Sequence, residues 1–295
     1  VLPMITSCSP GWINYCETFY PEFIPNLSSC KSPHEMMGAL IKSYYAEKSG
    51  LNAKDLAVVS VMPCTAKKIE ADREELAATG FPDVDAVITT RELARMIKSN
   101  GIDFLSLPDE EFDSLLGDST GAGAIFGATG GVMEAALRTA YETITGKTLE
   151  NLEFHMVRGV EDVKEAVIPL GDLNLRVAVA HGTANAKTLL ESIKSGEKQY
   201  DFIEIMGCRG GCVDGGGQPL VDAETRVRMD PRKMRARALY QADEGMTYRK
   251  SHENPGVKRI YEDYLGEPNS HKAHQLLHTH YTARNKYKTP QKPQA

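Results

Sequence analysis

The segment Ile205 to Pro219, which reads IMGCRGGCVDGGGQP, constrains the fold of this chain more than any other. It places Cys208 and Cys212 four residues apart in a run that is rich in glycine. Glycine lets a backbone turn sharply and approach another group closely, and thiolates on short loops are typical ligands of iron-sulfur clusters. The segment therefore predicts a tight loop around a bulky inorganic cluster.

Two further cysteines lie in loops of similar character. Cys8 is followed by serine, proline and glycine, and Cys64 comes directly after a proline. Together with Cys208 and Cys212 they supply the four thiolates that a cubane cluster usually takes. A zinc site is the main alternative, but zinc sites usually show two close pairs of cysteines, and this chain has one. The other two cysteines, Cys16 and Cys30, are expected to be small buried apolar side chains.

Short runs of β-branched residues alternate with helical stretches along the chain. The expected strands cover residues 2–7, 56–62, 85–89, 175–181 and 202–206. The expected helices cover residues 35–49, 65–77, 91–99, 131–145 and 183–195, the last with Thr183 as its N-cap. This alternation predicts an α/β fold with two lobes, each a mostly parallel sheet flanked by helices.

The cysteines lie where such a fold holds its ligands. Cys8 follows the first expected strand, Cys64 the second and Cys208 the last. In α/β folds, ligands bind beyond the carboxyl ends of the strands. The three loops are therefore expected to converge on one active site between the lobes.

Charge and hydropathy exclude several classes of function. The chain has 34 basic and 40 acidic residues and a net charge of -6, which argues against nucleic acid as its main partner. It contains no apolar run of about 18 residues, so we expect no membrane span. Its first residues lack the basic start and apolar core of a signal peptide. The cysteines are too few for a dense disulfide framework, which favours a reducing, cytoplasmic location.

The composition changes after about Val221. Residues 226–237 are basic and are expected to be helical, and the segment that follows is polar and rich in histidine. The histidines at 271, 274, 278 and 280 mimic metal spacing, but no thiol or carboxylate lies next to them, so we expect a solvated or packing role. The last residues are expected to be disordered. The chain also begins without methionine in what looks like the middle of a strand, so it is expected to be a fragment or a processed piece.

Three segments resemble, in order and spacing, the signature motifs of the catalytic domain of FeFe (iron-only) hydrogenases. They are TSCSPGW around Cys8, MPCTAKKIE around Cys64, and the loop with Cys208 and Cys212. The resemblance implies a 4Fe-4S cluster held by these four cysteines. It also implies a two-iron subcluster with carbon monoxide, cyanide and a dithiolate bridge, joined to the cubane through Cys212. The two units together form the H-cluster.

The resemblance also implies roles for the side chains around the two-iron unit. Lys67 is implied to give a charge-assisted bond to one cyanide. Ser32 and Pro33 are implied to hold the other cyanide through a hydroxyl and the backbone. Glu70 lies one turn after Lys67 on the same expected helix and could hold its ammonium. His34 stands where the family varies and receives no role. The implied apolar and polarizable wall consists of Met62, Phe126 and Met206.

The first motif departs from the usual family pattern, which has two adjacent cysteines where this chain has Cys8 and Ser9. By position, Cys8 falls on the proton relay and Ser9 on the cubane ligand. By the number of thiols, Cys8 must be the ligand and Ser9 could carry protons. A serine ligand is uncommon, so Cys8 is favoured as the ligand, and both residues are candidates for catalysis.

The resemblance implies an oxidoreductase that reversibly reduces protons to dihydrogen. Residues 1–245 are expected to form the catalytic domain, incomplete at its N-terminus, and residues 246–295 to form a wrapping tail like the family's small subunit. The implied partners are a ferredoxin or NAD(P)-linked electron-transfer subunits, and maturation proteins that deliver the two-iron unit. The alternatives are a related iron-sulfur assembly or scaffold protein without the two-iron unit, and a hydrogen-sensing hydrogenase.

Overall fold

The computed structural model describes residues 1–113 and 116–286 of the chain. The expected disordered ending falls mainly on residues 287–295, which lie outside the described residues. The strands are β1 (Met4–Thr6), β2 (Val59–Met62), β3 (Ala86–Thr89), β4 (Val163–Leu170), β5 (Leu173–His181) and β6 (Phe202–Met206). The helices are α1 (Pro10–Phe19), α2 (Pro33–Leu40), α3 (Ala46–Lys48), α4 (Lys67–Ala71), α5 (Thr90–Ser99), α6 (Gly121–Ala124), α7 (Gly131–Thr145), α8 (Thr183–Lys194), α9 (Ala223–Arg228), α10 (Pro231–Gly245), α11 (Pro255–Ile260) and α12 (His271–Leu277).

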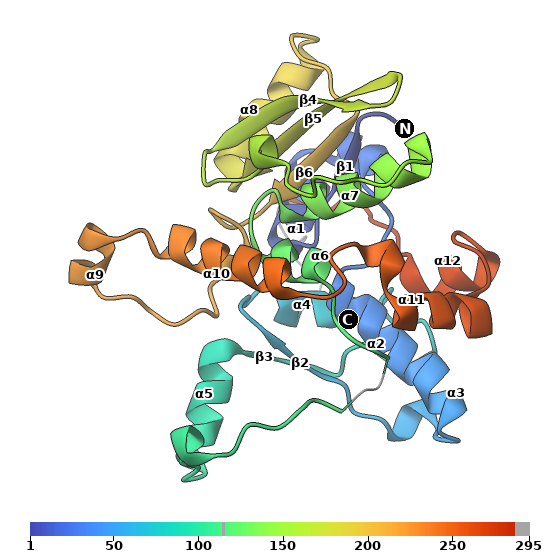
Figure 1. Cartoon of the computed structure of the whole chain (residues 1–295), viewed down its shortest axis with the longest axis vertical. Helices are drawn as coiled ribbons and strands as arrows, with labels where there is room; N and C mark the ends of the chain where they lie inside the picture. The colour runs from blue at the N-terminus through green and yellow to red at the C-terminus, as the bar shows by residue number, and fades with distance from the viewer. Residues whose placement is uncertain (114–115, 287–295) are drawn as a thin grey trace, which may run out of the picture.

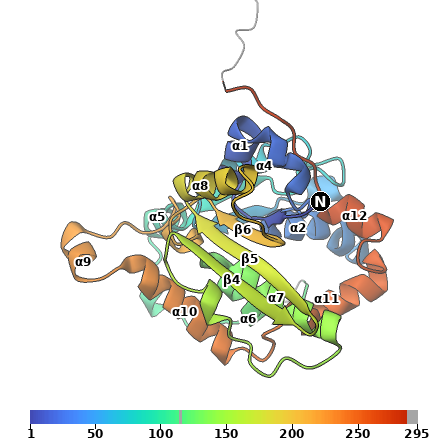
Figure 2. The ribbon, with the colours of Figure 1, turned by 90° about the horizontal axis from the view of Figure 1, so that it is seen from above.

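The larger sheet has four strands in the order β1-β6-β5-β4. β1, β6 and β5 run parallel, and β4 pairs antiparallel with β5. Because successive residues of a strand point to opposite faces, Ala178 and Ala180 of β5 pack with α1 and α8, whereas Val177 and Val179 pack with α7. Helices therefore cover both faces of this sheet (Figure 2).

The second sheet pairs β2 with β3 in parallel. The chain enters α5 from β3 through a capping box, in which Thr89 accepts a hydrogen bond from the Glu92 N–H and donates its own N–H to the Glu92 carboxylate. Figure 1 shows the four-stranded sheet at the top and the two-stranded sheet below, with α1, α4 and α6 between them. The predicted α/β fold with two lobes of largely parallel sheet is confirmed.

The C-terminal segment reaches both lobes. α10 packs on α6, and α11 and α12 share a buried cluster with Tyr44 and with side chains of α2. The chain then runs back to the first lobe, where the Lys31 N–H donates to the Leu277 carbonyl and the Arg284 N–H donates to the Glu17 carbonyl. This segment therefore contacts both lobes.

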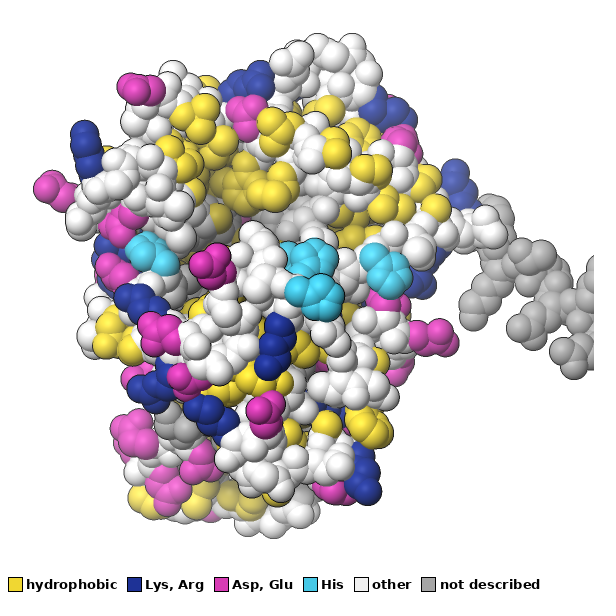
Figure 3. Space-filling view, turned by 90° about the vertical axis from the view of Figure 1, so that its right-hand side faces the viewer, with side chains coloured by type: hydrophobic (Ala, Val, Ile, Leu, Met, Phe, Trp, Pro, Cys, Tyr) yellow, Lys and Arg dark blue, Asp and Glu magenta, His cyan; other side chains and the backbone are white. Residues whose placement is uncertain are grey.

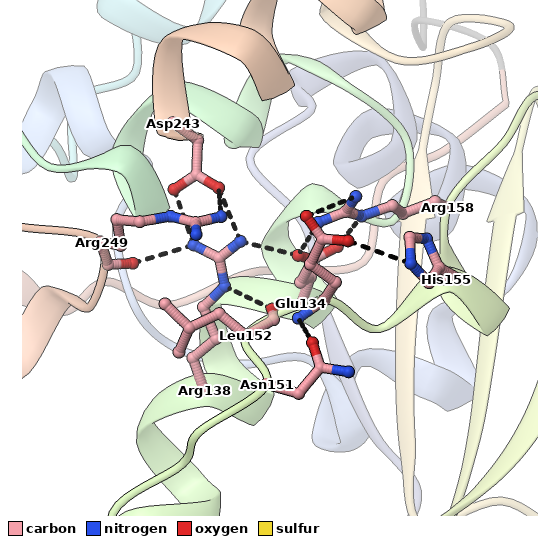
Figure 4. A network of polar contacts seen from close by, with 9 residues as sticks. Glu134, Arg138, Asn151, Leu152, His155, Arg158, Asp243 and Arg249 are labelled. Carbon is pink, nitrogen blue, oxygen red and sulfur yellow. Dashed lines mark hydrogen bonds and ion pairs between the residues drawn. The ribbon is translucent and has the colours of Figure 1, made fainter. Parts of the chain in front are cut away.

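A buried polar network fastens α7 to α10 and to the tail (Figure 4). The Arg138 guanidinium binds both oxygens of Asp243 at 2.8 Å and an oxygen of Glu134 at 2.7 Å. Arg249 also donates to Asp243, and Arg158 donates to Glu134. Each carboxylate is thus shared by two guanidinium groups, which offsets the cost of burying the charges.

Several expectations about elements are wrong in detail. β4 was not predicted, because it contains Pro169, and a proline within a run argues against a strand except at the edge of a sheet, where β4 lies. Gly182, not Thr183, is the N-cap of α8. The helix expected over 65–77 is only Lys67–Ala71, and the helix expected over 226–237 is interrupted before Pro231, which cannot donate a backbone hydrogen bond within a helix. Among the described residues, every helix is too short or too polar to span a lipid bilayer.

Candidate metal centre

The three cysteine loops begin at the ends of strands. Cys8, Cys64 and Cys208 each lie two residues beyond the last residue of β1, β2 and β6. β1 and β6 are neighbours in the larger sheet, and β2 belongs to the other sheet. The loops therefore meet between the two sheets, where the chain was expected to hold its ligands.

The four thiols of these loops influence one another directly. The Cys8 and Cys212 side chains share a hydrogen bond, which lowers the pKa of Cys8 and raises that of Cys212. Burial and the neighbouring Cys64 raise the pKa of Cys208, and Cys64 also lies close enough to affect Cys212. The structure thus brings all four predicted ligands together as free thiols.

The glycine run after Cys212 lets the third loop close on the second. The Gly217 N–H donates to the Pro63 carbonyl at 2.9 Å. A Cβ on Gly215 would lie 2.1 Å from that same carbonyl oxygen, and one on Gly217 would lie 2.8 Å from the Cβ of Thr89. Any side chain at these positions would push the loop of Cys212 away from the loop of Cys64.

Lys67 is a cation whose charge acts on two of the thiols. It is the first residue of α4 and is 5% exposed. Its charge adds to the effect of Cys212 in lowering the pKa of Cys8, and it opposes the rise in the pKa of Cys212. Lys67 Nζ donates to Glu70 Oε2 at 2.6 Å, one turn later on the same helix. The predicted pairing of Lys67 with Glu70 is present in the structure.

The remaining predicted site residues differ in their surroundings. Ser32 is buried, but its hydroxyl donates to Glu70 at 2.9 Å, so its single proton is already used. Pro33 is exposed at the start of α2. Met206 is 1% exposed at the end of β6, and Met62 is half-buried at the end of β2. Phe126 lies in the 3-10 segment Ile125–Gly127, which contacts the segment Cys212–Asp214.

Cys8 and Ser9 face different neighbours. Cys8 lies beside Cys212 and Lys67. The Ser9 hydroxyl accepts a hydrogen bond from the Gly207 N–H at 3.0 Å, so it holds the backbone next to Cys208. The two side chains therefore have different neighbours.

The two cysteines without a predicted role differ from each other. Cys16 is completely buried in α1, as expected. Cys30 is exposed, so the expectation that it is buried is wrong: it lies outside the regular helices, in an isolated bridge to His278 of the tail. The rings of His274 and His278 stack at 4.3 Å, and the Ser29 hydroxyl lies 2.8 Å from His278 Nδ1. Figure 3 shows histidine side chains gathered on this side of the molecule, in agreement with the predicted packing role.

Two buried residues beside Lys67 were missed as site residues. His34 Nε2 lies 2.5 Å from Glu70 Oε2, and Glu35 is completely buried. Burial raises the pKa of Glu35 to about 8, with the nearby charges of Glu70 and Asp83 adding to the effect. Their position in the sequence could have indicated them, because both are titratable and directly follow the predicted site residues Ser32 and Pro33.

The donor set fits the expected cofactor. Four cysteines from three loops match the ligand number of a cubane, and a buried ammonium beside two of them suits an anionic ligand. Zinc would also accept four thiolates, but the buried Lys67 beside Cys8 and Cys212 has no role in a plain tetrahedral site.

Comparisons with known proteins point the same way. Residues 1–216 match the family described as iron only hydrogenase large subunit, C-terminal domain, and residues 229–284 match the iron hydrogenase small subunit. The chain is 51% identical, over 97% of its length, to the NADP-reducing hydrogenase subunit HndD of Solidesulfovibrio fructosivorans. It spans about half the length of that relative, 48%.

A solved structure and a more distant relative complete the comparison. The structure of an FeFe-hydrogenase HydA1 variant from Chlamydomonas reinhardtii superimposes with a TM-score of 0.82 at 46% identity, covering 96% of this chain and 77% of that one. The chain is also 34% identical, over 96% of its length and 59% of the relative's, to the cytosolic Fe-S cluster assembly factor narfl of Xenopus tropicalis.

Proposed function

Because this chain belongs to the iron-only hydrogenase family, we propose that it forms the catalytic part of an enzyme that reversibly reduces protons to dihydrogen. The observation that carries the proposal is the meeting of Cys8, Cys64, Cys208 and Cys212 beside the buried ammonium of Lys67. A cubane needs the thiols alone. The ammonium suits a further unit with anionic ligands.

The four cysteines would hold a 4Fe-4S cluster, and Cys212, as the family resemblance implies, would also contact a two-iron unit. When bound, this H-cluster supplies the redox chemistry and the open iron position. Lys67 would donate a charge-assisted hydrogen bond to a cyanide and so fix the orientation of the unit. Buried Met206, together with Met62 and Phe126, would exclude water from the site.

The hydroxyl proton of Ser32 is used by Glu70, so we propose that this segment holds the other cyanide through the backbone N–H of Ser32. Pro33 has no N–H and would contribute only by packing. Cys8 is proposed as the fourth cubane ligand, because the Ser9 hydroxyl is held by the Gly207 N–H. Ser9 would then be the proton carrier next to the site.

Electrons would come from a ferredoxin or from NAD(P)-linked subunits, and maturation proteins would deliver the two-iron unit. The relative HndD is by name a subunit of an NADP-reducing hydrogenase, which supports the second donor. The division into a catalytic domain at residues 1–245 and a tail at 246–295 stays a prediction, as does the cytoplasmic location.

The second candidate is an iron-sulfur assembly protein, and the similarity to the Xenopus assembly factor favours it. An assembly or scaffold protein of this kind would hold a cubane but no two-iron unit. A sensory hydrogenase would carry the unit and turn over slowly.

Infrared spectroscopy of the full-length protein, matured with the two-iron unit, tests the proposal. Carbonyl and cyanide ligands on iron absorb where protein does not, so bands in that window together with hydrogen evolution are the expected result. Cubane iron without such bands would support the assembly protein instead. Bands without substantial hydrogen evolution would support the sensor.

A further inference from the structure

Glu70 is held by three donors that converge on one oxygen. Glu70 Oε2 lies 2.9 Å from Ser32 Oγ, 2.5 Å from His34 Nε2 and 2.6 Å from Lys67 Nζ. The three donors come from two segments, the start of α2 and the start of α4. The carboxylate therefore ties the helix that carries Lys67 to the segment that carries Ser32.

His34 is placed to use both of its ring nitrogens. Its side chain is 4% exposed, and Nδ1 lies 3.1 Å from the hydroxyl of Ser60 on β2. Burial lowers the pKa of His34, against the hydrogen bond to Glu70, which raises it. A neutral imidazole has one N–H, and Glu70 can only accept, so Nε2 carries the proton and Nδ1 accepts from Ser60.

Glu70 remains the anion in this arrangement. Burial by itself would raise the pKa of Glu70, but the hydrogen bond from His34 and the charge of Lys67 outweigh it and hold the pKa low. Glu35, whose Oε1 is 3.2 Å from His34 Nε2, is protonated at neutral pH because burial raises its pKa. One carboxylate thus faces one ammonium, and the second carboxyl does not compete for it.

The position of Glu70 decides where the ammonium of Lys67 lies. A lysine side chain is flexible and its ammonium has three N–H donors, of which Glu70 takes one. The others would be available to a ligand at the site of Cys8 and Cys212, whose pKa values respond to the charge of Lys67. If Glu70 moved, the ammonium would follow it, because a buried charge stays with its counter-ion.

We propose that His34 is a positioning residue, which aims Lys67 at the site by holding Glu70 and is itself anchored by Ser60. The identity of the ligand that Lys67 binds rests on the proposed function. The hydrogen bonds of His34 do not depend on it. It adds a residue that the family resemblance left without a role.

Substitutions that keep one nitrogen at a time test the proposal. His34→Gln keeps a donor near the position of Nε2, and His34→Asn keeps a polar group near Nδ1 only. His252→Gln is the matched control: His252 also lies between a hydroxyl and a carboxylate, Thr139 and Glu142, and Lys250 shares that carboxylate. His252 lies outside the candidate metal centre, so this control reports the general effect of losing such an imidazole.

The infrared spectrum of the matured full-length protein is the main readout. We expect His34→Gln and His252→Gln to keep the wild-type cyanide bands. His34→Asn should shift them and weaken retention of the two-iron unit by about 10- to 100-fold, the range typical of partners that orient a metal site from outside. Wild-type bands and retention in His34→Asn would overturn the proposal, as would equal shifts in both His34 variants.

Nitrogen NMR of the histidine rings separates this proposal from the proposed function. In full-length protein that carries the cubane but not the two-iron unit, the His34 signal should show a neutral ring protonated at Nε2. A charged ring or the opposite tautomer would overturn the inference. Absence of cyanide bands in the wild type, with the expected tautomer, would instead refute the proposed function.

A divalent ion is the competing occupant of this cluster, since His34, Glu35 and Glu70 could supply ligands to one. The ammonium of Lys67, 2.6 Å from Glu70, would repel such an ion. We therefore expect zinc titration to give the same uptake in the wild type and in Glu35→Gln, with no ion bound at this cluster. Stoichiometric uptake lost in that variant would assign the cluster to a metal and overturn the proposal.

Discussion

At the scale of single residues, Cys8 and Ser9 decide how the first motif works. Cys8 shares a hydrogen bond with Cys212, whereas Ser9 holds the Gly207 N–H. We expect Cys8→Ala to lose cluster iron, and Ser9→Ala to keep it while hydrogen evolution slows by about 10²- to 10⁴-fold, the usual contribution of a general acid. Iron, acid-labile sulfide and hydrogen evolution are measured in both variants.

The control for this pair is Cys16→Ala, which removes a buried thiol in α1 and should cost about 1 kcal/mol of stability with no loss of iron. If Cys8→Ala keeps its iron but loses turnover, Cys8 is the relay and the ligand assignment is wrong. Full activity in both variants would remove the functional role of the motif.

Glu35 should make stability depend on pH. Its pKa is about 8 in the folded protein, against 4.5 ordinarily, because burial disfavours the charged form. Because folding raises this pKa, the folded protein holds the proton more tightly than the unfolded chain. The contribution of Glu35 to the free energy of unfolding is therefore fully present below about pH 4.5 and is lost as the pH rises to about 8. The free energy of unfolding should fall by about 1.4 kcal/mol per pH unit in this window. Glu35→Gln, which cannot ionise, should lack this slope in denaturant unfolding; parallel curves for both proteins would contradict the assignment.

At the scale of elements, the sequence predicted those whose signal is local. β6 matches its expected bounds because five largely apolar residues form a buried parallel strand, and the capping residues of α5 lie within its own first turn. Local sequence signals could not predict β4, because it is formed by antiparallel pairing with β5. The cysteine loops were predictable from their strand ends, but the partners of His34 come from α4 and β2, which only the fold brings together.

The ion network between α7 and α10 was equally invisible in the sequence, since Arg138 and Asp243 are 105 residues apart. Both side chains are fully buried. Arg138→Met should therefore cost about 3–5 kcal/mol, because it leaves Asp243 and Glu134 with fewer partners in a dry interior. Urea unfolding measures the loss. The matched control, Arg176→Met, breaks a pair with Asp201 whose arginine is 45% exposed, and should cost about 0–1 kcal/mol. Equal costs would show that the network is not a principal fastening of α10.

At the scale of the whole molecule, the tail closes the structure by returning to the first lobe. It leaves α10 beside α6, packs α11 and α12 on the second lobe, and contacts α1 at Arg284. Both lobes and the tail meet at Glu17, which is completely buried. Its carboxylate binds Arg73, which follows α4, at 2.6 Å and Arg284 of the tail at 2.7 Å. The relative placement of the cysteine loops thus depends in part on Arg284, which is far from all four cysteines in sequence.

Glu17→Gln should loosen this junction. The amide of glutamine carries no charge to balance two guanidinium groups in a buried site. The free energy needed to detach the tail should therefore fall by about 3–5 kcal/mol. Hydrogen exchange of the amides at 279–284 should then speed up by about a hundredfold or more, since each 1.4 kcal/mol is tenfold. Glu22→Gln is the control, because Glu22 pairs with Lys194 at the surface, where both side chains are more than 40% exposed. It should leave exchange in the tail unchanged. If both variants exchange like the wild type, the tail is held by its apolar contacts with α2, and Glu17 serves only to neutralise Arg73.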